Sequence, residues 1–198
     1  LGDQAFGLFG HSVASAGDVN GDGYADVVVG APYRATTSYA NAGRASVFLG
    51  SGAGVSTTAS WHLTGDQAGA LYGYSVSSAG DVNGDGYADL VVGAPGMATG
   101  AGGAFVAGGR VALAFGDSAG LGADLVTADH FLAGAARGRA VGPAGDVNGD
   151  GSAEVALCSP GRDSGTGRVT LWSRKFGPTA RPRQLDAAGS PPIPHLGA

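Results

Sequence analysis

One segment of 24 residues occurs three times along this chain, and that repeat constrains the fold more than any other feature. Residues 9–32 read FGHSVASAGDVNGDGYADVVVGAP and residues 72–95 read YGYSVSSAGDVNGDGYADLVVGAP, so 20 of 24 positions are identical. A more divergent copy, RGRAVGPAGDVNGDGSAEVALCSP, occupies residues 137–160. The copies start 63 and 65 residues apart, and a regular period of this kind indicates a repeat architecture.

Each repeat is predicted to form four short strands. In the first unit, residues 11–16 alternate weakly and lead into a loop rich in Asp, Asn and Gly. The apolar run 25–31, ended by Pro32, is typical of a strand buried on both faces, so these two strands form a hairpin around the loop. The same pattern predicts further strands at 44–49 and 59–64, at 110–115 and 127–132, and at 168–172 and 183–187.

A four-stranded sheet of this size cannot bury both of its faces alone, so stacking against copies of itself is the stable arrangement. The sequence therefore predicts an all-β fold built of β-propeller blades. Propellers close with roughly four to eight blades, whereas this chain supplies three, so we expect a partial propeller that needs further blades as partners. The predicted units are blade one at 1–64, blade two at 65–133, a divergent blade three at 134–189 and a Pro-rich tail at 190–198.

Composition and charge exclude several other classes of protein. The chain contains 39 Gly in 198 residues, but they cluster in words such as NGDG rather than at every third position, which excludes collagen. The net charge of −5 argues against nucleic acid as a partner. The uncharged stretch 90–109 has the length of a membrane span, but seven Gly and one Pro indicate strands and a loop instead.

Each repeat carries the pattern Asp-x-Asn-x-Asp-Gly-x-x-Asp, which predicts a calcium loop. Oxygen side chains at positions 1, 3, 5 and 9, with a backbone carbonyl at position 7, are the hard ligands that Ca²⁺ prefers. Asn-Gly and Asp-Gly also favour plain turns, but a turn does not need four such side chains. An EF-hand is excluded because position 12 is Val29, Val92 or Leu157 instead of Glu. The predicted ligands are Asp18, Asn20, Asp22, Tyr24 and Asp26; Asp81, Asn83, Asp85, Tyr87 and Asp89; and Asp146, Asn148, Asp150, Ser152 and Glu154.

The motifs on both sides of these loops resemble a known family. They are FG at 9–10 with GAP at 30–32, YG at 72–73 with GAP at 93–95, and RG at 137–138 with CSP at 158–160. The first two pairs resemble the FG-GAP repeat of integrin α-chain N-terminal propellers and their bacterial relatives, and the third pair departs from it. The resemblance implies a seven-bladed propeller, extracellular or at the cell surface, with Ca²⁺ on one face and ligand on the other.

Two classes of function remain open. The first is a calcium-stabilised module for ligand binding or adhesion, without catalysis, which contacts a protein or a glycan through variable connections such as 33–41 and 97–108. The second is an accessory propeller of a larger secreted hydrolase or lyase. The pentad 116–120 matches G-x-S-x-G but aligns with a turn between third and fourth strands, so we expect no nucleophile there. Cys158, the only cysteine, is predicted to be a small buried thiol.

Overall fold

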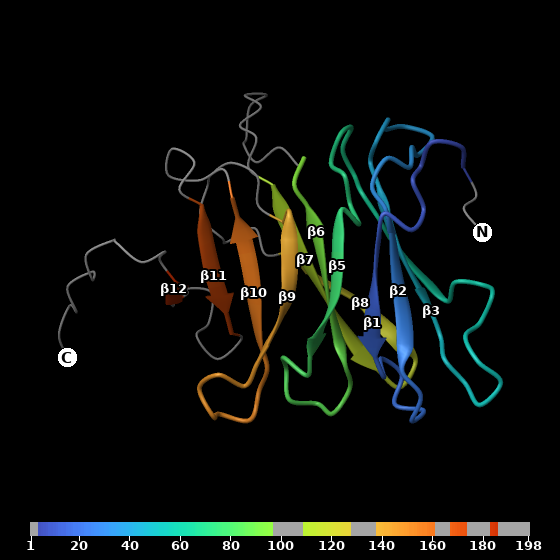
Figure 1. Cartoon of the computed structure of the whole chain (residues 1–198). Helices are drawn as coiled ribbons and strands as arrows, with labels where there is room; N and C mark the ends of the chain where they lie inside the picture. Colours follow the sequence, from blue (N-terminus) through green and yellow to red (C-terminus); the bar gives the residue numbers. More distant parts are fainter. Residues whose placement is uncertain (1–3, 97–108, 128–137, 161–166, 174–182, 186–198) are drawn as a thin grey trace.

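The chain folds into strands alone in the parts that its computed structural model describes, which are residues 4–96, 109–127, 138–160, 167–173 and 183–185 (Figure 1). These residues contain no helix, and so none that is long and apolar enough to cross a membrane. Three four-stranded sheets confirm the predicted all-β fold of propeller blades. The first sheet comprises β1 (Ser12–Gly17), β2 (Asp26–Ala31), β3 (Arg44–Phe48) and β4 (Trp61–Thr64); the second β5 (Ser75–Gly80), β6 (Asp89–Ala94), β7 (Arg110–Asp117) and β8 (Gly120–Thr127); the third β9 (Ala140–Gly145), β10 (Glu154–Ser159), β11 (Arg168–Trp172) and β12 (Arg183–Leu185).

Every sheet is antiparallel, and its strands lie side by side in chain order. The observed strands follow the predicted ones except at the last strand of the second sheet. That strand was predicted at 127–132, but Asp117 pairs with Gly120, so a tight turn leads directly from β7 into β8. Gly120 adopts φ 112°, a left-handed conformation that closes this turn without steric strain. Residues 128–132 and the predicted tail 190–198 lie outside the described residues.

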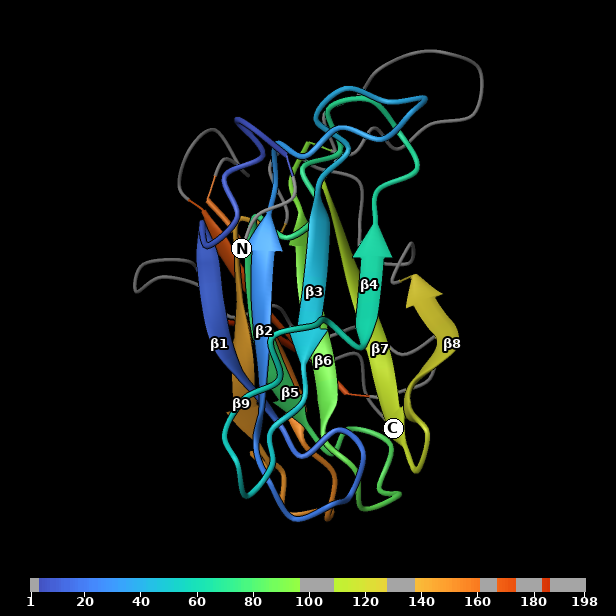
Figure 2. The same ribbon diagram turned by 90° about the vertical axis from the view of Figure 1, so that its right-hand side faces the viewer.

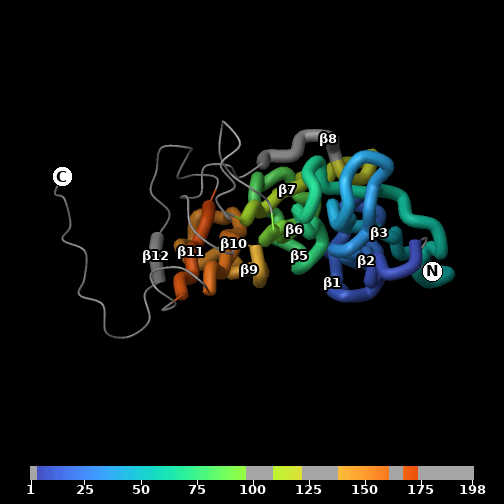
Figure 3. The backbone as a smooth tube through the Cα atoms, turned by 90° about the horizontal axis from the view of Figure 1, so that it is seen from above, coloured from blue at the N-terminus to red at the C-terminus, as the bar shows by residue number. Residues whose placement is uncertain are grey.

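The three sheets are stacked face to face in a row, as the view from above shows (Figure 3). The first strands of the sheets contact one another in sequence, β1 against β5 and β5 against β9. Two clusters of buried apolar side chains fill the spaces between sheets. One joins the first and second sheets through residues such as Val28, Val47 and Leu90, and the other joins the second and third through residues such as Val91 and Val155.

The central sheet shows why the repeat reads as continuous apolar runs. All six residues of β6 are buried. Leu90 and Val92 belong to the cluster shared with the first sheet, whereas Val91 belongs to the cluster shared with the third. Because successive side chains of a strand point to opposite faces, a strand between two neighbouring sheets carries apolar side chains on both faces.

Neighbouring sheets approach most closely at glycines. A Cβ added at Gly30 in β2 would overlap the carbonyl oxygen of Gly73, which precedes β5, and one added at Gly93 in β6 would overlap that of Gly138. Gly73 has φ 79°, a conformation that residues with a side chain rarely adopt. The GAP and FG glycines of successive repeats therefore form a direct backbone contact, which explains why both motifs contain Gly.

We expect Gly30→Ala to destabilise the chain by about 3 kcal/mol, because its Cβ meets backbone that cannot yield. Gly142→Ala in β9 is the matched control, since a Cβ there meets nothing within 4 Å. The control should change stability by less than about 1 kcal/mol, with a gain as its expected sign. Chemical denaturation of both variants measures the difference, and equal effects would contradict the glycine contact.

Candidate metal sites

The Asp-rich loops connect the first two strands of each sheet and lie at one end of the stack, the lower end in Figure 1. The connection between β2 and β3 lies at the opposite end. Each loop is anchored by two antiparallel strands, whose pairing slips by one residue immediately before the loops of the first two sheets. The fifteen predicted ligands therefore fall into three separate groups of five, one per sheet.

The carboxylate at position 1 organises the loop by accepting backbone amides. In the first loop, Asp18 Oδ1 accepts hydrogen bonds from the N–H groups of Gly21 and Asp22 at 2.7 and 3.0 Å, and Oδ2 accepts one from Gly23 at 2.8 Å. Asp81 repeats this pattern in the second loop, and Asp146 accepts two such bonds in the third. Three amides converging on one carboxylate form a concave backbone nest for negative charge.

The side chains at positions 3 and 5 lie next to each other. In the first loop, Asn20 Nδ2 donates to Asp22 Oδ2 at 3.0 Å, while Asn20 Oδ1 accepts from the Asp22 N–H at 3.2 Å. Asp22 Oδ1 accepts in turn from the Tyr24 N–H at 2.9 Å. The second and third loops repeat all of these bonds. The residues at positions 3, 5 and 7, which are predicted ligands, therefore lie in one small turn of each loop.

The acid at position 9 lies apart from this turn, inside the protein. Asp26, Asp89 and Glu154 are at most 1% exposed. Asp26 Oδ2 accepts from the Val19 N–H at 2.9 Å, and its Oδ1 accepts from the Gly50 N–H at 2.8 Å, beyond the end of β3. Asp89 makes the matching bonds to Val82 and Gly116 at 2.8 and 3.0 Å. In the first two sheets this acid therefore connects the loop to the C-terminal end of the third strand or to the residues just after it.

Burial raises the pKa of Asp89 to about 6, because removal from water disfavours the charged carboxylate. The hydrogen bonds from Gly116 and Val82 act in the opposite direction, and the nearby carboxylates Asp85 and Asp81 raise the pKa further. The like charges of the loop thus act on one another through a poorly solvated region. A cation among them would relieve that repulsion.

The third loop differs at this position, as its sequence suggested. Glu154 Oε2 accepts from the Val147 N–H at 2.9 Å, but its Oε1 accepts from Asn148 Nδ2 at 3.0 Å. The longer side chain thus contacts the loop's own position-3 residue, whereas Asp26 and Asp89 use that oxygen for a distant backbone amide. Asn148 is consequently shared between Glu154 and Asp150.

Sequence reasoning missed two features of these loops. The amides of Gly50 and Gly116 were not recognised as partners of the position-9 acids, although a Gly follows the third strand in both units. The loops also bridge the sheets: the Ala88 N–H donates to the Asp18 carbonyl at 3.0 Å, and the Ala153 N–H donates to the Asp81 carbonyl at 2.9 Å. A repeat pattern cannot reveal a bond between two of its copies.

The donor chemistry of each loop fits a hard cation such as Ca²⁺, since it offers three carboxylates and an amide oxygen within nine residues. Within the described ranges, no group of three or more His, Cys, Asp or Glu side chains is placed to hold a metal ion. In the first loop, the oxygens of Asp18 and Asp26 instead accept backbone amides. The predicted ligands of each site thus belong to a single Asp-rich loop, and calcium binding stays a prediction.

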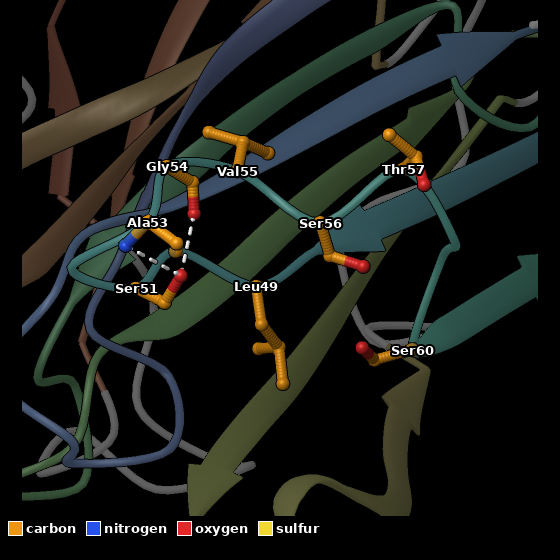
Figure 4. A pocket seen from close by; sticks show the side chains of 9 residues that line it. Leu49, Ser51, Ala53, Gly54, Val55, Ser56, Thr57 and Ser60 are labelled. Carbon is orange, nitrogen blue, oxygen red and sulfur yellow. Dashed lines mark hydrogen bonds between the residues drawn. The ribbon is translucent and has the colours of Figure 1, made fainter.

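The turn at Ser118 and a surface hollow do not have the arrangement of residues expected of a catalytic centre. Ser118 lies in the tight turn between β7 and β8, not in the strand-to-helix turn that a nucleophile elbow requires. A shallow hollow lies over the connection between β3 and β4 (Figure 4), where Ser51 Oγ donates to the Gly54 carbonyl at 2.8 Å. Its lining consists of small, apolar and hydroxyl residues, without an acid–base pair among them.

A family model for the FG-GAP repeat matches residues 9–48, 72–113 and 137–172, one segment for each sheet. The chain belongs to the FG-GAP repeat family. Its sequence is also similar to those of integrin α chains. It is 34% identical over 179 residues to integrin alpha-V of Gallus gallus, 41% over 98 residues to integrin alpha pat-2 of Caenorhabditis briggsae, and 40% over 96 residues to integrin alpha-IIb of Mus musculus.

The matched regions cover very different shares of the proteins compared. They span 89%, 48% and 48% of this FG-GAP chain, but only 16%, 8% and 9% of the respective integrin chains. The similarity therefore concerns the repeats themselves, in agreement with the three sheets and their loops. The recognition of the family from the FG, GAP and Asp-loop motifs is confirmed.

We expect Asp26→Ala to lower the free energy of unfolding by about 3 kcal/mol even in EDTA, because the Val19 and Gly50 amides lose their partner. Asp22→Ala is the matched control from the same loop, where the side chain is exposed. Its cost in EDTA should stay below about 1 kcal/mol. Denaturant titration in EDTA tests both; an Asp26→Ala variant as stable as the parent would contradict the structural role of this acid.

Proposed function

We propose that this FG-GAP chain is a calcium-stabilised binding module of an extracellular or cell-surface protein, and that it catalyses no reaction. The observation that carries this proposal is the difference between the loops at the two ends of the stack. The Asp-rich loops are alike in all three sheets and lie at one end, whereas the connection between β2 and β3, whose residues 33–41 are not repeated in the other units, lies at the other end. Varied loops on a rigid repeated scaffold are where recognition commonly resides.

Aromatic and charged side chains support a recognition surface at that second end. His11, Tyr74 and Arg139 each follow an FG-type glycine, one from each sheet. The rings of His11 and Tyr74 are 4.8 Å apart, and the Arg139 guanidinium carbon lies 6.0 Å from the Tyr74 ring centroid. A row of this kind, crossing three sheets, offers stacking and hydrogen-bonding groups to a protein or glycan ligand.

The connection 33–41 adds to the same end. Tyr33 and Tyr39 are 38% and 41% exposed. The loop is ordered by its own bonds, since the Thr36 N–H donates to the Tyr39 carbonyl and the Tyr39 N–H donates to Thr36 Oγ1, both at 2.9 Å. A loop that is already ordered loses little entropy on binding, which favours affinity. The integrin α relatives support assignment of this FG-GAP chain to adhesion at a cell surface.

Calcium is proposed as the structural cofactor because nine of the 16 acidic residues are concentrated in the three loops. Oxygen atoms of Asp18, Asn20 and Asp22 would hold it in the first loop, with the Tyr24 carbonyl and Asp26 as the remaining predicted ligands. Its positive charge would offset the repulsion between these carboxylates. Because the loops also bridge neighbouring sheets, occupancy would stabilise the contacts between sheets as well as each turn.

We expect a chelator to lower the melting temperature of the chain. At millimolar calcium and a Kd near 10⁻⁴ M, linkage contributes about 1.4 kcal/mol per site. Differential scanning calorimetry in EDTA and in excess CaCl₂ measures the effect, with MgCl₂ as the control cation. Identical melting in EDTA and in calcium would show that the metal has no structural role.

The third site is expected to bind calcium most weakly. Glu154 Oε1 already accepts a hydrogen bond from Asn148 Nδ2, so two of the predicted ligands are bonded to each other. Isothermal titration calorimetry should resolve two tighter sites and one weaker site. Glu154→Asp should bring the third affinity closer to the others, and three equal affinities in the parent would contradict this expectation.

Ligand capture should depend on the varied loops and not on the Asp-rich ones. Replacing residues 33–41 by a Gly/Ser linker of the same length should abolish binding to whichever component of immobilised protein and glycan panels the parent captures. Calcium affinity should stay within about twofold of the parent, because the loop lies at the opposite end. Hydrolysis of an ester, phosphodiester or glycoside that is lost in Ser118→Ala would overturn the binding-module proposal.

A further inference from the structure

Charged residues are divided between the two ends of the stack. The three Asp-rich loops hold nine carboxylates at one end, and they contain no Lys or Arg. The described residues at the opposite end include five arginines and a histidine, which are Arg34, Arg44, Arg110, Arg139, Arg168 and His11. Among the carboxylate side chains that the structure describes, only that of Asp66 lies at this end, 4.0 Å from Arg110. The two ends therefore carry opposite charge.

Three of these arginines recur at one position of the repeat. Arg44, Arg110 and Arg168 begin β3, β7 and β11, and each pairs with the last residue of the preceding strand. Because that preceding strand starts at the Asp-rich loop, the arginines lie at the far end of each sheet, where Figure 2 shows the connection between β2 and β3 of the first sheet. Stacked sheets lie roughly 10 Å apart, so the repeat places positive charge at a regular interval along the stack.

The row of His11, Tyr74 and Arg139 adds hydrogen-bond donors at the same end. His11 and Arg139 are exposed, and Tyr74 is half-buried. The His11 and Tyr74 N–H groups donate to the Leu8 and Leu71 carbonyls at 3.0 and 3.1 Å, so the same kind of turn holds both residues. An imidazole, a phenol and a guanidinium can each donate a hydrogen bond to an anion, and the bond is stronger when the donor is charged.

The row and the arginines lie next to each other. The FG-type glycine of one sheet lies against the start of the third strand in the preceding sheet: a Cβ added at Gly73 or Gly138 would overlap the carbonyl oxygen of Arg44 or Arg110, respectively. Electrostatic attraction extends over about 10 Å in about 0.1 M salt, so these arginines raise the positive potential at the row. We call the combined set the cationic track, which consists of His11, Tyr74, Arg139, Arg44, Arg110 and Arg168.

We propose that the cationic track binds an acidic glycan, a linear polysaccharide with carboxylate or sulfate groups. Such a polysaccharide carries its charges at a constant interval, as the track does, whereas the carboxylates of a folded protein surface follow no such period. The exposed rings of Tyr33 and Tyr39 at the same end add aromatic surface against which the C–H groups of a sugar can pack. The Asp-rich loops repel this ligand, so it is steered to one end of the stack. This assignment names the ligand class of the binding module proposed above and rests on that proposal.

The test measures binding of labelled oligosaccharides to the whole chain in CaCl₂ by fluorescence anisotropy. Heparin fragments carry sulfate and carboxylate, hyaluronan fragments carry carboxylate alone, and neutral dextran is the control. Binding of either acidic glycan supports the proposal, and the tighter of the two identifies the preferred anionic group. Three stacked sheets span roughly 20 Å, so a fragment longer than this should bind at least about tenfold more tightly than the disaccharide of the same glycan. Equal affinities of the disaccharide and the long fragment would contradict a track that crosses the sheets.

A single substitution separates the track from the net charge of the chain. Arg139→Gln should weaken binding of the long fragment at least about fivefold, because a charged hydrogen-bond donor is lost. Arg139→Lys keeps the charge and should recover part of the affinity. Ala53→Asp is the matched control, since it changes the net charge by the same amount at an exposed position between β3 and β4, at the opposite end. Its affinity should stay within about twofold of the parent, and an equal loss in both variants would refute the track.

Two further comparisons separate the ligand class from the binding module itself. If the chain captures a protein or a neutral glycan through residues 33–41 but binds neither acidic glycan, the track is refuted and the proposed function stands. If poly-L-glutamate of matched length binds more tightly than both acidic glycans, the ligand is an acidic protein segment and the glycan assignment is wrong. If the chain captures nothing from the immobilised panels and neither acidic glycan, both proposals fail.

Discussion

The structure depends on the burial of two apolar faces by each four-stranded sheet. A single sheet of this repeat has Val or Leu side chains on both sides of its second strand, and water contacts at least one side unless another sheet covers it. Stacking resolves this problem for the central sheet completely. At Gly30 and Gly93 the stacked sheets come so close that a Cβ would overlap the backbone of the next sheet.

The Asp-rich loops serve the fold and the proposed metal site with the same residues. The position-1 carboxylate holds the turn by its backbone bonds, and the carbonyl of the same residue accepts an amide from the next sheet. The buried position-9 acid connects the loop to the end of the third strand. Charge, turn geometry and contact between sheets are therefore coupled in nine residues. A substitution in the loop is expected to affect the hydrogen bonds between neighbouring sheets as well.

The opposite end of the stack carries the connection between β2 and β3, whose residues 33–41 are not repeated in the other units. The ordered loop at 33–41 and the row of His11, Tyr74 and Arg139 are held by a scaffold whose rigidity comes from the core and the Asp-rich loops. The proposed binding function rests on this exposed loop and row of side chains, which lie at the end opposite the Asp-rich loops.

The sequence by itself determined the repeat, the four strands per unit, the all-β stacking and the Asp-rich loops, because these depend on local pattern and on burial that recurs at a fixed period. Only the tertiary structure decided how the copies contact one another. The Ser12 bond to Gly73, the Asp26 bond to Gly50 and the early start of β8 after Asp117 each depend on groups brought together by the stacked sheets or the turn geometry.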